Sequence, residues 1–418
     1  MVMISWKPWL LCLLLLGATV CRATSILIPM DDKQSNHLKA YGIAFLVLEK
    51  GLNVEWLLNY RGGSFMIDYL PTILEECTVR GVTYEALSDV NTQAILMEIA
   101  NPEANMNVVR LERAPRIAVY SPKNEIILDE TDAVILVLDY AEIPYDIIYD
   151  EEILNDVLAK YDWLHLHHED FTGQGGRSRW RESSRIEIKT QEALAQKLGY
   201  PKLSELKLNV ALKIKGYTLG GGYLFAMCSG AETFDIALSA EGTDINESMY
   251  DGDEQDPYAQ EKLDYEKALA FENFTLEPGE SRRFSDINTG RPGYSDRGTS
   301  YFDVFSFSAK WDIIPTLLTQ NHNNAIHEFT GQTTAFNKAL VKPTVLILGE
   351  SSGTNRVRYI YGELGKGHWT YYSGHDPEGT PGRGRGPTDL NLFPDSPGYR
   401  LILNNVLFPS ARKKKQKT

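Results

Sequence analysis

Apolar and polar residues alternate along the N-terminal part of the chain with two different periods, and each period predicts its own kind of element. Residues 25–29 form a short apolar run typical of a strand, whereas residues 36–50 repeat apolar side chains at the three- and four-residue spacing of a helix. Gly51 ends this helix. The elements expected next are a strand, a helix and a strand, over residues 54–58, 71–80 and 82–86.

A second strand–helix–strand series follows the first. Residues 116–120 predict a strand, residues 130–142 an apolar helix, and residues 145–149 another strand. Residues 26–60 and 117–149 therefore have the spacing of two βαβ units. Such units predict parallel strands joined by right-handed crossovers.

The rest of the chain continues the alternation. Residues 161–170 run from a strand into a polar loop, and a further strand ends at Cys228. The other elements expected are helices over 190–198, 203–216 and 397–407, and strands over 344–348, 356–361 and 368–373. We therefore expect an α/β protein with a doubly wound, mostly parallel, flavodoxin-like sheet, an N-terminal βαβ module and an acidic insertion. In such sheets ligands collect at the carboxyl ends of the strands.

Shifts in composition divide the chain into segments. The expected segments are a signal peptide, an N-terminal α/β module, a main α/β domain in two pieces, an insertion with some β content and a basic tail, over residues 1–23, 24–112, 113–243 with 342–410, 244–341 and 411–418. The acidic run at residues 251–257 lacks the spacing and the distal glutamate of a calcium-binding loop. We interpret it as solvated surface.

The first residues have the pattern of a secretory signal. Lys7 precedes the apolar run 10–17, which is too short to span a bilayer, and small residues follow as far as Ala23. Cleavage after Ala23 predicts an extracytoplasmic protein, periplasmic or secreted. A lipoprotein anchored at Cys21 is the alternative, although Val20 stands where that processing needs a small residue. No later segment is long and apolar enough for a stable membrane span.

Charge and cysteine content narrow the partners and the covalent framework. The formal net charge of -14 argues against nucleic acid, because such a surface repels phosphates. Removal of the signal leaves Cys77 and Cys228 of the 4 cysteines, which is too few for a disulfide framework. Either these two form one bridge or each is free, and Cys77 has the setting of a buried helix residue.

Cys228 has the most informative setting in the chain. It follows an apolar run and precedes the small residues Ser229, Gly230 and Ala231, which open a helix. A strand–cysteine–helix turn exposes the thiol at the edge of a sheet and directs the helix N-terminus toward it, which favours the thiolate. The same geometry forms the nucleophile elbow of α/β hydrolytic enzymes.

A cysteine nucleophile needs a base and a group that orients the base. His375 is the leading base, because it follows a predicted strand, and Asp376 and Glu378 are nearby carboxylates that could orient it. The backbone N–H of Ser229, with Gly230 beside it, is a candidate donor for an oxyanion hole.

These motifs resemble those of a known superfamily. Residues 226–230 resemble the nucleophile elbow of the class I glutamine amidotransferase-like fold, and residues 374–378 are similar to its His-Pro-Glu segment. Residues 365–376 look even more like the end of the trehalose-utilisation (ThuA-like) branch, which lacks the cysteine. This chain departs at Ala226, where a glycine is usual, and at Asp376, which is inserted before Pro377.

The whole chain also resembles secreted proteins labelled asparagine synthetase B. That label implies a cysteine at the mature N-terminus and a glycine-rich ATP loop, and the sequence contains neither. Its residues therefore do not support that chemistry.

A second polar cluster follows the predicted strand at residues 161–166. It consists of His165, His167, His168, Glu169 and Asp170. One interpretation is that His168, Glu169 and Asp170 line the crevice beside Cys228. A second is that the imidazoles and a carboxylate bind a divalent metal. A third is that His165 packs in the sheet while His168 and Asp170 cap the following loop. No cofactor is otherwise expected.

Three functions remain open. The first is a hydrolase that uses Cys228 and His375 on an amide or related acyl bond. The second is a non-catalytic module that binds a small molecule, a glycan or a peptide, and the third is a metal-dependent hydrolase. The second rests on aromatic residues such as Trp163, Trp180, Trp369, Tyr371 and Tyr372.

Overall fold

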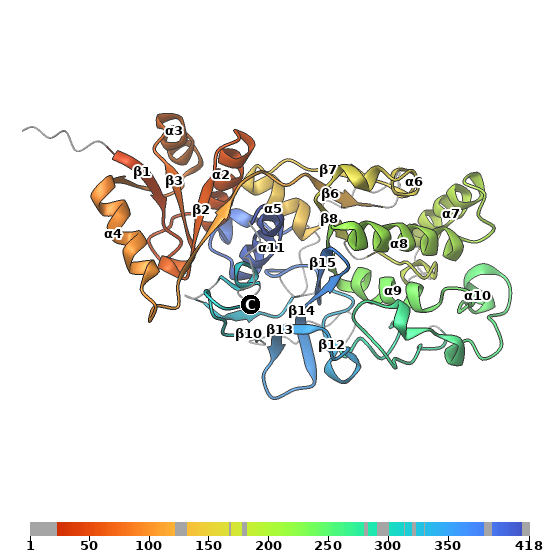
Figure 1. The fold of residues 1–418 in the computed structure, drawn as a ribbon. Coiled ribbons are helices and arrows are strands. Elements are labelled where there is room, and N and C mark those ends of the chain that lie inside the picture. The colour runs from red at the N-terminus through yellow and green to blue at the C-terminus, as the bar shows by residue number, and fades with distance from the viewer. Residues whose placement is uncertain are drawn as a thin grey trace, which may run out of the picture.

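The computed structural model contains two β-sheets with helices packed against both (Figure 1). The residues that it describes are 23–121, 132–166, 169–177, 182–279, 283–290, 301–312, 314–319, 323–329, 331–379 and 387–411. Residues 1–22 of the predicted signal peptide and 412–418 of the predicted tail lie outside them. Within the described part of the chain, no helix is both long enough and apolar enough to cross a membrane.

The first sheet has five strands in the order β4-β1-β3-β2-β5, and all neighbouring pairs are antiparallel. Its elements are β1 (Ala23–Ile28), α2 (His37–Glu49), β2 (Val54–Leu58), β3 (Ser64–Asp68), α3 (Pro71–Arg80), β4 (Glu85–Ser88), α4 (Asp89–Ala100) and β5 (Asn107–Leu111). α2 joins β1 to β2 around β3, and α3 joins β3 to β4 around β1. This split βαβ connectivity is ferredoxin-like.

The expected parallel pair over residues 26–60 is therefore wrong. The strands predicted there exist as β1 and β2, but β3 lies between them and pairs antiparallel with both. No strand is predicted at β3, because five residues directly after a glycine turn show too little periodicity.

Helices cover both faces of this sheet because β1 directs successive side chains to opposite sides. Ile26 belongs to the core shared with α2 and α3, whereas Leu27 packs in a separate cluster with Ile99 of α4. α2 begins at a true cap, since the side chain of Asn36 accepts a hydrogen bond from the backbone N–H of Lys39 at 2.9 Å.

The second sheet has ten strands in the order β11-β10-β13-β14-β15-β9-β8-β6-β7, with β12 paired to β14. The strands are β6 (Ile117–Tyr120), β7 (Asp146–Ile148), β8 (Trp163–Leu166), β9 (Tyr223–Met227), β10 (Tyr301–Val304), β11 (Ala325–His327), β12 (Phe336–Asn337), β13 (Leu346–Ser351), β14 (Arg356–Leu364) and β15 (Gly367–Tyr372). β7, β6, β8, β9 and β15 pair in parallel, and the other pairs are antiparallel.

The prediction of a doubly wound, mostly parallel, flavodoxin-like sheet is wrong. One sheet is wholly antiparallel, and the other is mixed. Strands β10, β11 and β12 come from the predicted insertion and enter the large sheet. Periodicity identifies a strand but not its neighbours, because those depend on contacts between residues far apart in the sequence.

Helices also cover both faces of the parallel strands. These helices are α5 (Ala133–Ala141) and α11 (Pro397–Leu407) on one face, with α6 (Asp150–Leu154), α7 (Glu182–Lys197), α8 (Leu203–Gly220), α9 (Cys228–Ser239) and the short α10 (Ser248–Asp251) on the other side or at its margin. α5 and α11 also contact α2 and join the two sheets into one core. Arg400 of α11, fully buried, donates to the carbonyl oxygen of Gly62 at 2.7 Å across this junction.

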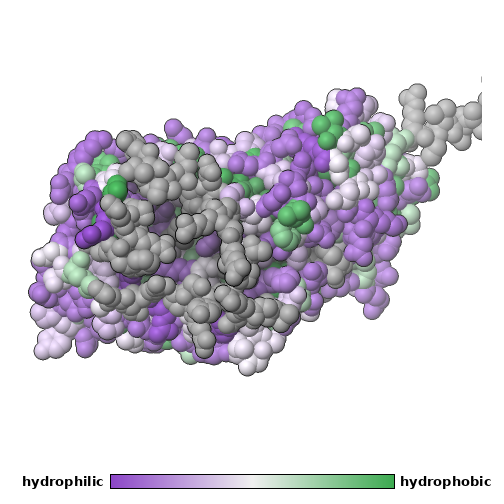
Figure 2. Space-filling model, turned by 180° about the vertical axis from the view of Figure 1, so that it is seen from behind, coloured by the Kyte–Doolittle hydropathy of each residue, from purple (hydrophilic) through white to green (hydrophobic). Residues whose placement is uncertain are grey.

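The surface seen from behind is mostly hydrophilic where it is described, and its apolar side chains occur in small separate spots (Figure 2). This agrees with a formal net charge of -14. On this side the described surface therefore offers polar groups rather than a broad apolar face.

Candidate functional site

Cys228 lies at a strand–helix elbow. β9 ends at Met227, α9 begins at Cys228, and β9 is flanked by the parallel strands β8 and β15. The backbone of Cys228 has a φ of 53°, in the left-handed region that residues other than glycine seldom adopt. Such strain is concentrated at functional sites, where the surrounding fold holds it in place.

The sulfur of Cys228 has three polar neighbours. Sγ accepts hydrogen bonds from the backbone N–H groups of Gln332 at 3.2 Å and Thr333 at 3.4 Å. Burial, the largest effect, acts to raise the pKa of Cys228, but the hydrogen bond and charge of His375 and the two amides together lower it below its ordinary value. The geometry therefore favours a thiolate beside His375.

Gly331 packs directly against both members of this pair. Its φ is +151°, and a β-carbon added there would lie 2.8 Å from Nδ1 of His375 and 3.0 Å from Sγ of Cys228. The segment from Gly331 to Thr333 thus covers the thiol, and Cys228 is fully buried.

Replacing Gly331 with alanine is expected to destabilise the protein by about 2 kcal/mol, from backbone strain and overpacking. The methyl group has to displace either Cys228 or His375, so the pKa of Cys228 should also rise. Urea denaturation and titration of the thiolate absorbance measure the two effects. Gly353→Ala is the control, because Gly353 has a φ of +73° but open space around its Cα. Equal effects in both variants would contradict the expected contact.

The two carboxylates predicted to orient His375 tie its loop to α11. Asp376 accepts hydrogen bonds from the hydroxyls of Thr388 at 2.5 Å and Tyr399 at 3.1 Å. Glu378 accepts one from the hydroxyl of Ser396 at 2.6 Å, and burial raises the pKa of Glu378. Their hydrogen bonds therefore fix the loop that carries His375.

The predicted oxyanion donor lies in the first turn of α9. Ser229 and Gly230 are buried there, next to Cys228 in the sequence. The role of the Ser229 N–H stays a prediction.

The histidine cluster divides in the structure. His165 is fully buried between Trp163 and Phe225, with Nδ1 3.2 Å from the carbonyl oxygen of Phe225 and Nε2 3.1 Å from a carboxylate oxygen of Asp132. Since Asp132 also caps α5, His165 joins that helix to the sheet. His167 and His168 lie outside the described residues.

Glu169 and Asp170 lie in the loop after β8. Asp170 accepts hydrogen bonds from the backbone N–H and the hydroxyl of Thr172, so it closes a local turn. The carbonyl oxygen of Glu169 accepts a hydrogen bond of 2.8 Å from the hydroxyl of Thr233 in α9. This loop thus packs on the helix that Cys228 begins.

A buried charged cluster near the carboxyl ends of β6 and β7 was not predicted. Nζ of Lys207 lies 2.8 Å from the hydroxyl of Tyr120 and 3.2 Å from a carboxylate oxygen of Asp150, and all three side chains are buried. Burial raises the pKa of Glu169 to about 8, although Lys207 acts to lower it. A lysine on the apolar face of the predicted helix 203–216 was the available signal.

Glu232 is a second buried group that the sequence did not predict. It follows Cys228 by one helical turn and is fully buried, and its carboxylate accepts hydrogen bonds of 2.7 Å from the hydroxyls of Ser285 and Thr333. Burial raises the pKa of Glu232 to about 7. The four-residue spacing from Cys228 was a signal for a shared helix face, but the hydroxyl partners come from distant segments.

Titration of Glu232 should make stability depend on pH. A carboxyl group with a raised pKa stabilises the fold fully below its unfolded pKa of 4.5, and this contribution is lost as the pH rises through about 7. The free energy of unfolding should therefore fall by about 3 kcal/mol over this range. Urea denaturation at a series of pH values should show a shallower fall in Glu232→Gln.

The control for this slope is Glu254→Gln, because Glu254 is exposed. Its pH dependence should match that of the unaltered protein. If Glu232→Gln also kept the full slope, Glu232 would not be the group that titrates.

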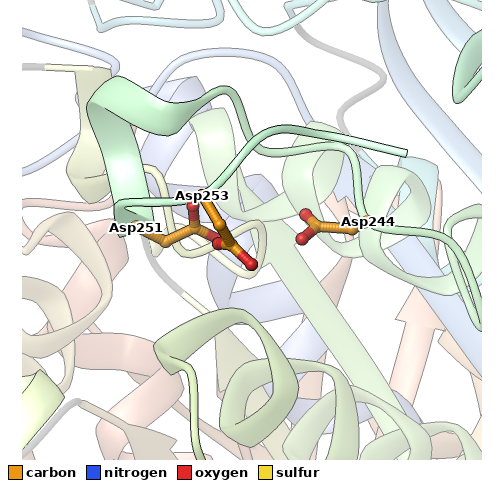
Figure 3. A group of neighbouring side chains, drawn as sticks. All are labelled: Asp244, Asp251 and Asp253. Atoms are coloured by element: carbon orange, nitrogen blue, oxygen red, sulfur yellow. The ribbon is translucent and has the colours of Figure 1, made fainter. Parts of the chain in front are cut away.

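An acidic cluster occurs in the predicted insertion, where the carboxylates of Asp244, Asp251 and Asp253 lie together (Figure 3). Nζ of Lys202 lies 2.5 Å, 3.1 Å and 2.6 Å from oxygens of these three residues. The ammonium group therefore takes the position that a divalent cation would need, and these hydrogen bonds raise the pKa of Lys202 against the opposing effect of burial.

Two cavities lie away from Cys228. One of about 130 Å³ is lined by Gln174, Arg177 and Tyr250 among others, and one of about 550 Å³ lies where β8 and β9 begin, beside Tyr161 and Tyr217. Neither includes Cys228 or His375 in its lining.

Comparison with known proteins gives distant likenesses only. No family model matches the chain, and no curated protein does. Solved structures similar to it include "Cytoplasmic Protein STM3548 from Salmonella typhimurium", with a TM-score of 0.36, 11% identity and coverage of 72% of this chain and 100% of that one. "Cytoplasmic Protein STM1381 from Salmonella typhimurium LT2" has a TM-score of 0.35 and 14% identity, and the match covers 71% of this chain and 99% of that one.

A third similar structure is a catalytic mutant of Gan42B, a GH42 β-galactosidase from G. stearothermophilus. Its TM-score is 0.28 at 12% identity, and the match covers 62% of this chain and 27% of that one. Likenesses at this level assign neither a fold family nor an activity, so the function has to be argued from the residues of the site.

Proposed function

We propose that the protein is a cysteine-dependent hydrolase of an amide or related acyl bond. One observation carries the proposal: the sulfur of Cys228, at a strained strand–helix elbow, accepts two backbone N–H groups and lies with His375 against Gly331. The resemblance of residues 226–230 and 374–378 to amidotransferase motifs points to the same bond type.

In this reaction the thiolate of Cys228 attacks the carbonyl carbon, and the carbonyl π electrons move to the oxygen. The tetrahedral species collapses, the carbon–nitrogen bond breaks, and the amine leaves with a proton from the His375 imidazolium. His375 then takes a proton from water as the water oxygen attacks the thioester. The carbon–sulfur bond breaks, which releases a carboxylic acid and restores the thiolate.

The full burial of Cys228 favours a second candidate, a non-catalytic module that binds a glycan or peptide elsewhere. The aromatic residues that suggested it give it less support, since Trp163, Trp369, Tyr371 and Tyr372 all lie in the core. Trp180 lies outside the described residues. The metal-dependent alternative loses support because both ring nitrogens of His165 have protein partners.

The proposal is tested by a screen of primary amides, peptides and acyl esters, with product release measured for the unaltered protein, Cys228→Ser and Cys77→Ser. Cys77 is the matched control, because it is also a free, fully buried cysteine. We expect turnover that Cys228→Ser removes and Cys77→Ser keeps, together with a thioester adduct at Cys228 in mass spectra. Turnover that persists in Cys228→Ser would refute the role of the thiol.

Binding to a glycan array by both the unaltered protein and Cys228→Ala, without any hydrolysis, would instead support the binding module.

The extracytoplasmic location belongs to the same proposal and rests on residues 1–23. N-terminal sequencing of the protein recovered from its native cells would test it, and a chain that keeps residues 1–23 would contradict it.

A further inference from the structure

The segment that covers Cys228 is held at several points. The hydroxyl of Thr333 donates to Glu232 at 2.7 Å, and the carbonyl oxygen of Thr333 accepts from the N–H of Gly374 at 2.6 Å. The carbonyl oxygen of Gln332 accepts from the side-chain amide of Asn288 at 3.0 Å. Because these contacts fix the peptide planes, they also fix the direction of the two N–H groups that meet the sulfur.

Glu232 connects this segment to the helix that carries the nucleophile. One carboxylate oxygen accepts from Thr333 and the other from Ser285, and the side chain is fully buried one helical turn after Cys228. A carboxylate can accept from both hydroxyls at once, whereas a glutamine side chain has one acceptor oxygen and would leave one hydroxyl facing an N–H group. In its ionised form, Glu232 thus holds the hydroxyls of Thr333 and Ser285 together.

We infer that the N–H groups of Gln332 and Thr333 are the donors that stabilise negative charge at the reaction centre, and that Glu232 is the residue that positions them through Thr333. This inference rests on the proposed function. In the resting protein the two N–H groups bond the sulfur of Cys228. As the carbon–sulfur bond forms, the charge moves to the adjacent carbonyl oxygen, and we expect the same two donors to bond that oxygen.

The direct test compares Thr333→Val with Thr333→Ser. Valine keeps the shape and the backbone N–H but loses the bond to Glu232, whereas serine keeps the hydroxyl. We expect Thr333→Val to raise the pKa of Cys228 by about one unit, measured by the thiolate absorbance against Cys228→Ser, and Thr333→Ser to stay near the unaltered value. An unchanged pKa in Thr333→Val, or an equal shift in Thr333→Ser, would overturn the inference.

A comparison of Glu232→Gln with Ser285→Ala shows whether Glu232 acts on the N–H donors through Thr333 or only stabilises the surrounding fold. Glu232→Gln should raise the pKa of Cys228 as Thr333→Val does, because it disturbs the acceptor of the Thr333 hydroxyl. Ser285→Ala removes the other partner of Glu232, on a segment that does not bond the sulfur, and should leave the pKa nearly unchanged. A shift in Ser285→Ala as large as that in Glu232→Gln would contradict the path through Thr333. If Glu232→Gln fails to fold, the Thr333 pair still decides the question.

The thiolate readout needs no substrate, so the two proposals can fail separately. If the pKa of Cys228 shifts as expected but no hydrolysis is found, the positioning role of Glu232 is supported and the proposed hydrolase activity is refuted. If Cys228→Ser removes hydrolysis but Thr333→Val leaves kcat unchanged, the proposed hydrolase activity is supported. The role of the Gln332 and Thr333 N–H groups is then refuted. A fall in kcat at constant KM in Thr333→Val is the expected result.

Discussion

Replacing His375 with alanine is expected to raise the pKa of Cys228 above its ordinary value and to lower the thiolate population at neutral pH by at least about tenfold. Burial acts to raise this pKa, and the hydrogen bond and charge of His375 are the largest effects that oppose it. Without the imidazole, burial prevails, because the two remaining amides offer less stabilisation. Thiolate absorbance as a function of pH measures the change.

In the chain without residues 1–23, which contain Cys12 and Cys21, the other cysteine does not interfere. Burial raises the pKa of Cys77 to about 12, so Cys77 stays protonated at neutral pH. His327→Ala is the matched control, since His327 is exposed in β11. That control should titrate like the unaltered protein. If the protein hydrolyses an amide, His375→Ala should also slow turnover by about a thousandfold, the usual contribution of a positioned acid–base group. A normal pKa for Cys228 in the unaltered protein would remove the basis for the dyad.

Replacing Lys207 with methionine is expected to lower the free energy of unfolding by about 4 kcal/mol. Methionine fills most of the volume of lysine, but Asp150 would stay fully buried without its cation, and Tyr120 would lose a hydrogen-bonding partner. Breaking one half of a buried ion pair is costly because the remaining charge is neither solvated nor paired. Urea denaturation at neutral pH measures the loss.

The same helix supplies the control. Lys213 pairs with Asp156 at 2.6 Å, but the two side chains are 40% and 75% exposed. Lys213→Met should therefore cost less than about 1 kcal/mol, because water solvates the carboxylate that remains. Replacing Lys207 and Asp150 together by apolar residues should recover much of the loss. Similar losses in Lys207→Met and Lys213→Met would show that burial of the pair does not determine its contribution.

Local elements followed from the sequence wherever short-range signals were strong. The helices predicted at 71–80 and 397–407 occur as α3 and α11 with the same limits, since each starts with a proline in its first turn. The strand at 54–58 is β2, and the last two predicted strands pair as β14 and β15. Cys77 lies buried in α3 and is free.

Strand order did not follow from the sequence, and the fold class was wrong for that reason. β1 and β2 are real strands, but the short β3 enters between them, and the edge of the large sheet is built by β10 and β11. The sequence of a strand does not indicate which distant segment will form backbone hydrogen bonds with it, because strand pairing depends on the packing of the whole domain.

The candidate site divides along the same line. The sequence by itself determined the elbow at Cys228, because a strand, a cysteine and small residues opening a helix are all local in the chain. It also pointed to His375 as the base. Only the tertiary structure decided that Gly331, Gln332 and Thr333 close over the sulfur and that Glu232 holds them, since these contacts join segments about a hundred residues apart. The energy of these contacts depends on burial and on the distances between their atoms, and no local sequence pattern contains that information.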